Sequence, residues 1–232
     1  WPEQLTIAKA AFLHKDDPTN AGPLDVRPLL ILPTIYRRWA GLRLHNCADW
    51  VAKWQLPDMF AGVPGLSAED AAYGTAIDLE DLNTQGIPFS GAVADIYKCF
   101  DQICRPLVEA LLIEAGFPTR ILKPYLAMLN NLTVYNTFAG HLGEGHKHPS
   151  GLPQGCPFSM MITALLLRPW LCKMTALNTI PRILADDILL IATGQGTHLR
   201  KLVPAVEATF KYILDIGGKA AANKSALFSS TN

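Results

Sequence analysis

The chain has 232 residues, half of them hydrophobic and 17% charged, which is enough to bury the core of one domain or of a domain with an attached lobe. Its 20 basic and 20 acidic residues balance, so the chain lacks the basic excess that most nucleic-acid enzymes show, and strongly basic parts of such an enzyme would have to lie outside this sequence. Five cysteines without a C-x-x-C pair argue against a disulfide framework and indicate reduced, intracellular thiols, and no apolar run reaches the roughly 18–20 residues that cross a bilayer.

The N-terminal third is predicted to be mainly helical. The cluster of Asp, Asn, Gly and Pro from Asp16 to Pro23 indicates a loop. From Thr34 to Trp54, apolar and aromatic residues recur at helical spacing, which predicts one helix. The segment 62–65 interrupts this pattern, and Ser67 followed three residues later by Asp70 predicts the start of a second helix.

The middle of the chain is predicted to combine one strand with several helices. Residues 91–96 form a short apolar strand with an acidic residue near its end. A helix is expected to begin at Pro106 and to end at Gly116, and another follows Pro118. Beyond it we expect a strand at 133–138, a turn at 140–145 and a long, mostly buried helix at 158–177.

The C-terminal part predicts a β-hairpin followed by a helix and a last strand. Two apolar runs, 180–185 and 188–193, are separated by Asp186-Asp187, which predicts a two-residue acidic turn. Thr197 is placed to cap a helix that Gly217 ends. This order of elements predicts an α+β fold with helices on one face of a small antiparallel sheet, close to a split βαβ unit.

Three carboxylates at the ends of apolar strands carry the chemical information. Burying a carboxylate is costly unless the group is paired or binds a cation, and Asp95, Asp186 and Asp187 would also repel one another. Two divalent cations about 3.5–4 Å apart would remove the repulsion and provide the arrangement used in phosphoryl transfer. Taken alone, Asp186-Asp187 is more typical of a hairpin turn than of a metal site, because Asp tolerates the positive φ that such turns need.

The sequence resembles reverse transcriptases in a series of motifs that occur in the family's order. Asp-Ile-Tyr-Lys-Cys-Phe-Asp at 95–101 is similar to motif A, especially to the form found in group II intron and related non-LTR enzymes. Gly-Leu-Pro-Gln-Gly-Cys-Pro-Phe-Ser at 151–159 is similar to motif B, and Leu-Ala-Asp-Asp at 184–187 to motif C. Weaker similarities are Asn-Lys-Ser at 223–225 to motif D, and Arg27-Pro28, Tyr36-Arg37 and 60–67 to the fingers motifs.

The resemblance implies the fold and the activity of the family. We expect the fingers and palm of a right-hand polymerase, with fingers over 1–90, a palm carrying motifs A to D over 91–232, and no visible thumb. The implied activity is RNA-directed DNA synthesis at a primer 3′-hydroxyl with two Mg²⁺ ions, for which Mn²⁺ could substitute. The implied partners are an RNA template, a DNA or RNA primer, deoxynucleoside triphosphates and the remainder of a larger polyprotein. A membrane partner is not expected, and the choice between nucleus and cytoplasm stays open.

The resemblance also assigns roles at the metal site. Asp95 and Asp186 would be the principal metal ligands and Asp187 a weaker third one, with the backbone carbonyl of Ile96 as a further ligand. Lys224 matches the motif D lysine that would protonate the pyrophosphate leaving group.

Other residues would bind the nucleotide. Phe100 falls where the family keeps an aromatic steric gate beneath the incoming sugar, although a core aromatic fits the same position. Gln154 and Gly155 would contact the template or the nucleotide, since glycine lets backbone approach closely. Lys15 and Arg27 would hold the triphosphate, or would be ordinary solvated charges.

Departures from the family's motifs leave alternatives open. Leu184 replaces an aromatic, Val63 an arginine and Cys156 a serine, which suggests divergence or reduced efficiency. An RNA-dependent RNA polymerase would show Gly-Asp-Asp in motif C and a polar residue at Phe100, and this sequence has neither. The alternative from a different class is a non-catalytic, domesticated reverse-transcriptase-like scaffold that binds nucleic acid. The three retained carboxylates argue against it.

Overall fold

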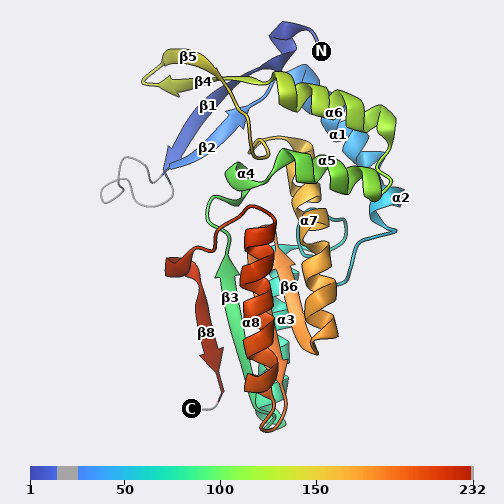
Figure 1. The fold of residues 1–232 in the computed structure, drawn as a ribbon, viewed down its shortest axis with the longest axis vertical. Helices are drawn as coiled ribbons and strands as arrows, with labels where there is room; N and C mark the ends of the chain where they lie inside the picture. Colours follow the sequence, from blue (N-terminus) through green and yellow to red (C-terminus); the bar gives the residue numbers. More distant parts are fainter. Residues whose placement is uncertain (15–25, 231–232) are drawn as a thin grey trace. The chain divides into compact units, whose positions relative to one another are not determined.

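The computed structural model describes residues 1–14 and 26–230, and the predicted loop at 16–23 lies outside them. The chain forms two compact units, each assembled from two separate stretches of sequence. Unit 1 comprises Trp1–Cys47 and Ile103–Ser159, and unit 2 comprises Ala48–Gln102 and Met160–Asn232. The assignment of fingers to 1–90 and palm to 91–232 stays a prediction. Both units combine a sheet with helices, which confirms the α+β class (Figure 1).

Unit 1 is built on a four-stranded sheet in the order β2-β1-β4-β5. Strand β1 pairs antiparallel with β2 and parallel with β4, and β4 pairs antiparallel with β5. The strands are β1 (Ile7–His14), β2 (Val26–Ile31), β4 (Thr133–Phe138) and β5 (His141–Lys147). The helices of this unit are η1 (Glu3–Thr6), α1 (Thr34–His45), α5 (Arg105–Glu114), α6 (Thr119–Asn131) and the first turn of α7 (Pro157–Ala176).

The core of unit 1 lies against one face of its sheet. Ala8, Ala10, Leu30 and Val134 are each at most 5% exposed, whereas residues at alternate positions face solvent, as expected of a half-buried sheet. A cluster of rings adds to this core, because Phe158 at the start of α7 makes edge-on contacts with three other aromatic residues. These are Trp39 of α1, Phe117 in the connection between α5 and α6, and Tyr125 of α6.

Two elements of unit 1 differ from the sequence prediction. Residues 141–147 form strand β5, whereas a turn was predicted at 140–145; the turn is confined to Ala139 and Gly140, both at positive φ. The helix predicted over 34–54 ends at His45, and the short helix α2 (Ala48–Val51) follows. Helical periodicity continues across the break, and therefore the apolar pattern alone did not reveal it.

Unit 2 contains a four-stranded antiparallel sheet in the order β6-β7-β3-β8. Its strands are β3 (Phe89–Asp95), β6 (Thr179–Leu184), β7 (Asp187–Thr193) and β8 (Ala226–Ser229). Its helices are α2, α3 (Ala68–Thr84), α4 (Cys99–Gln102), the remainder of α7, α8 (His198–Asp215) and η2 (Ala222–Lys224). The predicted long helix over 158–177 and the predicted hairpin are therefore both present.

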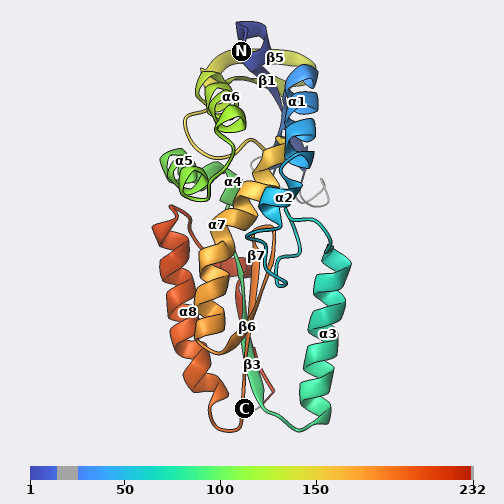
Figure 2. The ribbon, with the colours of Figure 1, turned by 90° about the vertical axis from the view of Figure 1, so that its right-hand side faces the viewer.

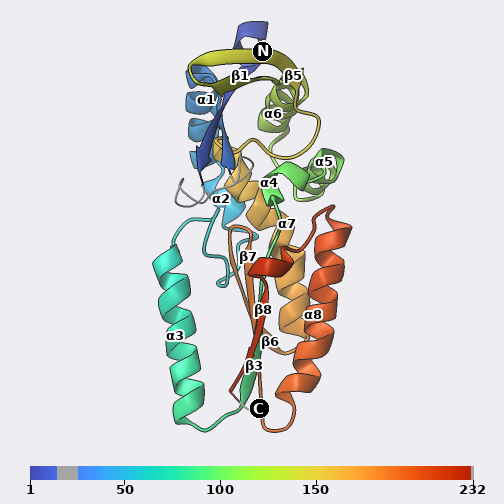
Figure 3. The same ribbon diagram turned by 90° about the vertical axis from the view of Figure 1, so that its left-hand side faces the viewer.

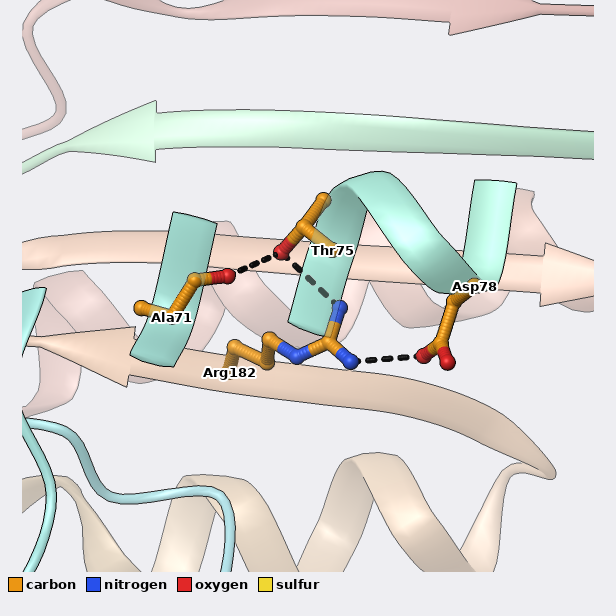
Figure 4. Close-up of polar contacts among 4 residues, drawn as sticks. All are labelled: Ala71, Thr75, Asp78 and Arg182. Carbon is orange, nitrogen blue, oxygen red and sulfur yellow. Dashed lines mark hydrogen bonds and ion pairs between the residues drawn. The ribbon is translucent and has the colours of Figure 1, made fainter. Parts of the chain in front are cut away.

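Helices lie on both faces of this sheet, with α3 on one side and α7 and α8 on the other (Figures 2 and 3). The sequence predicted helices on one face for the elements from residue 91 onward, and α3, which precedes them in the chain, covers the opposite face. The attachment of α3 is partly polar, since Arg182 of β6 donates to Thr75 Oγ1 at 2.9 Å and forms an ion pair with Asp78 at 2.6 Å (Figure 4). Thr75 in turn donates to the carbonyl oxygen of Ala71. No residue of α3 is fully buried.

The predicted helix ends are largely confirmed. Ser67 and Asp70 form a capping box in which each side chain bonds the other residue's backbone N–H. Helix α8 ends at Asp215, and the two glycines that follow close its last turn: the N–H of Gly217 donates to the carbonyl of Leu214, and that of Gly218 to the carbonyl of Ile213. Thr197 precedes α8, but its side chain makes no capping hydrogen bond. None of the helices formed by the described residues combines the length and apolar character needed to cross a bilayer.

Candidate active site

The register of two central strands in unit 2 brings two predicted site residues together. Asp95 is the last residue of β3 and Asp187 the first of β7, and the two are paired across the antiparallel ladder. Paired residues in such a ladder carry their side chains on the same face of the sheet, and like charges in this position destabilise it. The pairing therefore places two carboxylates where a cation would stabilise the strand ends.

The hairpin that carries Asp186 turns one residue earlier than predicted. Leu184 pairs with Asp187, so the two turn residues are Ala185 and Asp186. Asp187 is already the first residue of β7. Ala185 adopts φ 60°, a left-handed conformation that costs an L-residue about 1 kcal/mol or more. The correction has a consequence for the site, because the ladder fixes Asp187 while Asp186 extends from the tip of the hairpin.

The electrostatic surroundings of these residues are negative. Burial raises the pKa of the Asp186 carboxyl, and the charges of Asp187 and Asp95 raise it further. Burial likewise raises the pKa of Asp187, with a second contribution from Asp95. The thiol of Cys99 experiences the same field, since burial, Asp186 and Asp95 together raise its pKa to about 12. The site therefore favours a cation.

One cation of the protein itself occupies part of this site. Lys224 Nζ lies 3.0 Å from Oδ2 of Asp95, and the side chains are 60% and 14% exposed, respectively. This hydrogen bond raises the pKa of Lys224, and the charge of Asp95 raises it further. The segment before Lys224 is tied to β3 by the N–H of Ala221, which donates to the carbonyl oxygen of Asp95 at 2.8 Å.

The donor set fits a hard divalent cation in type. Asp95, Asp186 and Asp187 offer only carboxylate oxygens, the ligands that Mg²⁺ prefers. Ile96, which directly follows Asp95 in the sequence, is 1% exposed and forms a β-bridge with Ala220. Within residues 1–14 and 26–230, however, no three His, Cys, Asp or Glu side chains are grouped closely enough to hold a metal ion. Asp95 Oδ2 is instead paired with an ammonium group, which would compete with a bound cation for the charge of this carboxylate.

Phe100 lies in unit 2, close to Asp95 along the chain. It belongs to α4, and its side chain is half-buried. Lys98 adopts a positive φ of 46° just before this helix, and its carbonyl accepts the N–H of Asp101. This turn fixes the start of the short helix on which Phe100 stands. A half-buried ring is compatible with the predicted steric gate and does not distinguish it from a partly packed aromatic.

The remaining predicted nucleotide residues belong to unit 1. Gln154 and Gly155 lie in the loop before α7, where the N–H of Leu30 donates to the carbonyl oxygen of Gln154 at 2.7 Å. A Cβ at Gly155 would come within 2.4 Å of the Leu30 carbonyl oxygen, and φ at this glycine is +122°, so that no other residue fits here. Arg27 is exposed on β2, and Lys15 lies outside the described residues.

Two further features of unit 1 were not predicted from the sequence. The thiol of Cys156, at the motif B position where serine is usual, lies 3.1 Å from the Tyr36 hydroxyl in the core, which explains how the substitution is accommodated. Arg105 is buried and contacts the loop at Gly151. The sequence does hint at the unusual position of Arg105. An arginine is the first residue of the helix at 105–114, and no acidic residue stands in the first turn to pair with it.

The site residues thus fall into two sets. Unit 2 holds the three carboxylates with Ile96, Phe100 and Lys224, and unit 1 holds Arg27, Gln154 and Gly155.

Comparison with protein families gives a match over residues 23–232 to the family described as reverse transcriptase (RNA-dependent DNA polymerase). No curated protein matches the sequence.

Solved telomerase structures have a similar fold. Apo telomerase from Candida tropicalis, truncated from the C-terminal domain, matches with a TM-score of 0.71 at 11% identity over 99% of this chain and 51% of that one. Telomerase from the same species in complex with a TWJ fragment of telomeric RNA gives 0.71 at 11% identity, over 98% and 41%. The corresponding Candida albicans complex gives 0.61 at 12% identity, over 100% and 43%. The chain spans about half or less of these proteins, and at such identities the likeness shows the fold alone.

Proposed function

Because the chain belongs to the reverse transcriptase (RNA-dependent DNA polymerase) family, we propose that it is the catalytic part of an RNA-directed DNA polymerase. It would extend a DNA or RNA primer with deoxynucleoside triphosphates along an RNA template. The motif A sequence favours an origin in a non-LTR retroelement or group II intron, and the whole enzyme would include segments beyond this chain, such as the remainder of a polyprotein.

The observation that carries the proposal is the register of β3 and β7, which pairs Asp95 with Asp187 beside the hairpin tip at Asp186. Asp95 and Asp186 would hold the cations, with Asp187 and the carbonyl of Ile96 as further ligands. Bound there, two Mg²⁺ ions, or Mn²⁺ in their place, would polarise the attacking 3′-hydroxyl and neutralise the pyrophosphate leaving group. The raised pKa values of Asp186 and Asp187 support this role, because burial and the neighbouring carboxylates disfavour the ionised forms, which a bound cation would stabilise.

Lys224 supports the proposal as the residue that would donate a proton. Its ammonium lies at the carboxylates while remaining 60% exposed, so it can leave Asp95 without the cost of breaking a buried pair. Released from Asp95, it would protonate the departing pyrophosphate oxygen, the role that general acids perform in such transfers.

Several further residues would select and hold the nucleotide. The ring of Phe100 would exclude a ribose 2′-hydroxyl, and Gln154 with Gly155 would contact the template–nucleotide pair through a loop whose backbone no side chain obstructs. Arg27, exposed on β2, would hold the triphosphate with its planar fork, together with Lys15.

Primer extension on poly(rA)/oligo(dT) with Mg²⁺ tests the proposal. We expect the wild-type chain to extend the primer, and the Asp186→Asn variant to lose at least about a thousandfold in rate, because a metal ligand is removed. The matched control is Asp215→Asn, which changes an exposed carboxylate on α8. Extension by Asp186→Asn at the wild-type rate would refute the assignment of this site.

One observation favours a second candidate, a non-catalytic nucleic-acid-binding scaffold. Among the described residues no metal cluster is formed, and Asp95 is instead paired with Lys224. Titration with Mn²⁺ followed by electron paramagnetic resonance separates the two functions. Wild-type binding that Asp186→Asn abolishes supports the polymerase, whereas absence of binding at millimolar Mn²⁺ together with retained RNA affinity supports the scaffold.

A further inference from the structure

Arg105 is a buried cation whose side chain contacts three separate segments of unit 1. It is 8% exposed and opens helix α5. Its Nε donates to the carbonyl oxygen of Gly151 at 2.8 Å, and Nη1 donates to that of Leu129 at 2.9 Å. Its Nη2 lies 3.0 Å from Nδ1 of His148. A guanidinium can only donate, so the Nδ1 of His148 must be the acceptor.

Placing a positive charge here is unfavourable for two physical reasons. Burial removes water from the guanidinium, and none of the ion pairs formed by the described residues supplies it with a carboxylate. The residue is also the first of α5, where the helix dipole repels cations and the first turn has no acidic side chain. The three neutral acceptors are what offsets this cost, and they match the planar, forked geometry of arginine.

The segment that Arg105 contacts is the loop Gly151–Gly155, which other contacts fix at several points. The N–H of Gly151 donates to the carbonyl of Ile103 at 2.9 Å. The hydroxyl of Ser159 donates to the carbonyl of Pro153 at 3.0 Å. At the far end, Leu30 of β2 donates to Gln154. Arg105 is the charged side chain in this set, and through Leu129 it ties the loop to α6 as well.

We propose that Arg105 is a positioning residue, which holds the Gly151–Gly155 loop in the single conformation that presents Gln154 and Gly155. The inference rests on the proposed function, in which these two residues contact the template–nucleotide pair. Since the loop acts on binding and Arg105 touches no reacting atom, its loss should raise KM for the deoxynucleotide far more than it lowers kcat.

The test replaces the planar guanidinium of Arg105 but keeps its positive charge. Arg105→Lys retains the positive charge and most of the side-chain volume, and Arg120→Lys on the exposed part of α6 is the matched control. Hydrogen exchange measured by mass spectrometry on residues 150–156 reports the loop directly. For Arg105→Lys we expect the hydrogen-exchange rates of the Gly151 and Cys156 amides to rise about tenfold. We expect KM for dTTP to rise by the same factor, because one charged hydrogen bond is lost. Arg120→Lys should change neither quantity.

A second pair of variants tests the contact without touching the buried arginine. His148→Leu removes the acceptor of Nη2, whereas His148→Asn offers an amide oxygen near the position of Nδ1. We expect His148→Leu to raise both quantities several-fold and His148→Asn to restore them.

The outcomes distinguish the positioning role of Arg105 from the proposed polymerase activity. Unchanged loop exchange in both Arg105→Lys and His148→Leu would overturn the positioning role. Faster exchange with an unchanged KM would overturn its link to nucleotide binding. A wild-type chain that does not extend primers would refute the proposed polymerase function, and the exchange measurements would still decide whether Arg105 holds the loop.

Discussion

The ammonium of Lys224 and the carboxylate of Asp95 form an ion pair of 3.0 Å at the end of the central strand β3. Lys224 pairs with only one oxygen, Oδ2, of this carboxylate. A divalent cation bound to Asp95 would therefore compete with the ammonium for the negative charge of the carboxylate and would weaken the ion pair. Such competition would favour movement of Lys224 toward the leaving group.

Replacing Lys224 by methionine should separate metal binding from turnover. We expect Lys224→Met to bind Mn²⁺ several-fold more tightly, because a competing charge is removed, and to extend primers more slowly, because a proton donor is lost. Electron paramagnetic resonance and primer extension measure the two effects. Lys211→Met, which removes an exposed lysine paired with Asp215, is the control. Equal Mn²⁺ affinities in Lys224→Met and wild type would contradict the competition.

Substitution of Phe100 should change the choice of sugar. Phe100→Ala opens space beneath the nucleotide, and we expect the ratio of dTTP to rUTP incorporation to fall by about tenfold or more while dTTP incorporation is retained. Single-nucleotide primer extension with each substrate gives this ratio. Tyr73→Ala on the exposed side of α3 serves as the control, since Tyr73 is 71% exposed. Unchanged rejection of rUTP would mean that Phe100 is a packing residue only.

The polar attachment of α3 to β6 should contribute measurably to stability. Arg182 is 11% exposed and bonds both Thr75 and Asp78 (Figure 4). Asp78 is 38% exposed, so solvent weakens its ion pair with Arg182. We expect Asp78→Asn to lower the free energy of unfolding by about 0.5 kcal/mol and Arg182→Met by about 1–3 kcal/mol. Urea unfolding measures these values, with Glu80→Gln on α3 as control. Arg182→Met should also speed hydrogen exchange along α3, and an unchanged rate there would show that α3 is held by other contacts.

Asp58 should make folding stability depend on pH. Burial raises the pKa of this carboxyl; the charge of Asp78 raises it further, and Arg182 lowers it. With a folded-state pKa above the unfolded one, the unfolded state releases its proton first as pH rises. The Asp58 contribution to the free energy of unfolding therefore falls with increasing pH between the two values.

The Asp58→Asn variant isolates this effect. Its stability should equal or exceed that of the wild type at pH 7, and the difference should shrink as pH is lowered toward 4, as measured by urea unfolding at several pH values. Asp49→Asn on α2 is the control. A constant difference between Asp58→Asn and wild type across this range would contradict the raised pKa.

Local sequence was sufficient where the interacting residues are close in the chain. The capping box of Ser67 and Asp70 and the C-terminal glycines of α8 involve residues a few positions apart, so the prediction needed no tertiary information. The hairpin was also predicted, but with its turn at Asp186-Asp187. Alternation of apolar residues fixes the strands and not the turn, and positive φ at Ala185, an unusual choice for alanine, was not detectable.

The candidate site shows the same division. The sequence alone determined the identity of the three acidic residues and their place at strand ends, because an acidic residue next to an apolar run is visible in any single segment. It did not determine that Asp95 pairs with Lys224, or that Arg105 reaches Gly151 and Leu129. Those contacts join residues far apart in the chain, whose meeting depends on strand register and helix placement. Only the tertiary structure decided them, because such pairings follow from the free energy of the whole packed unit and leave no periodic signal in any one segment.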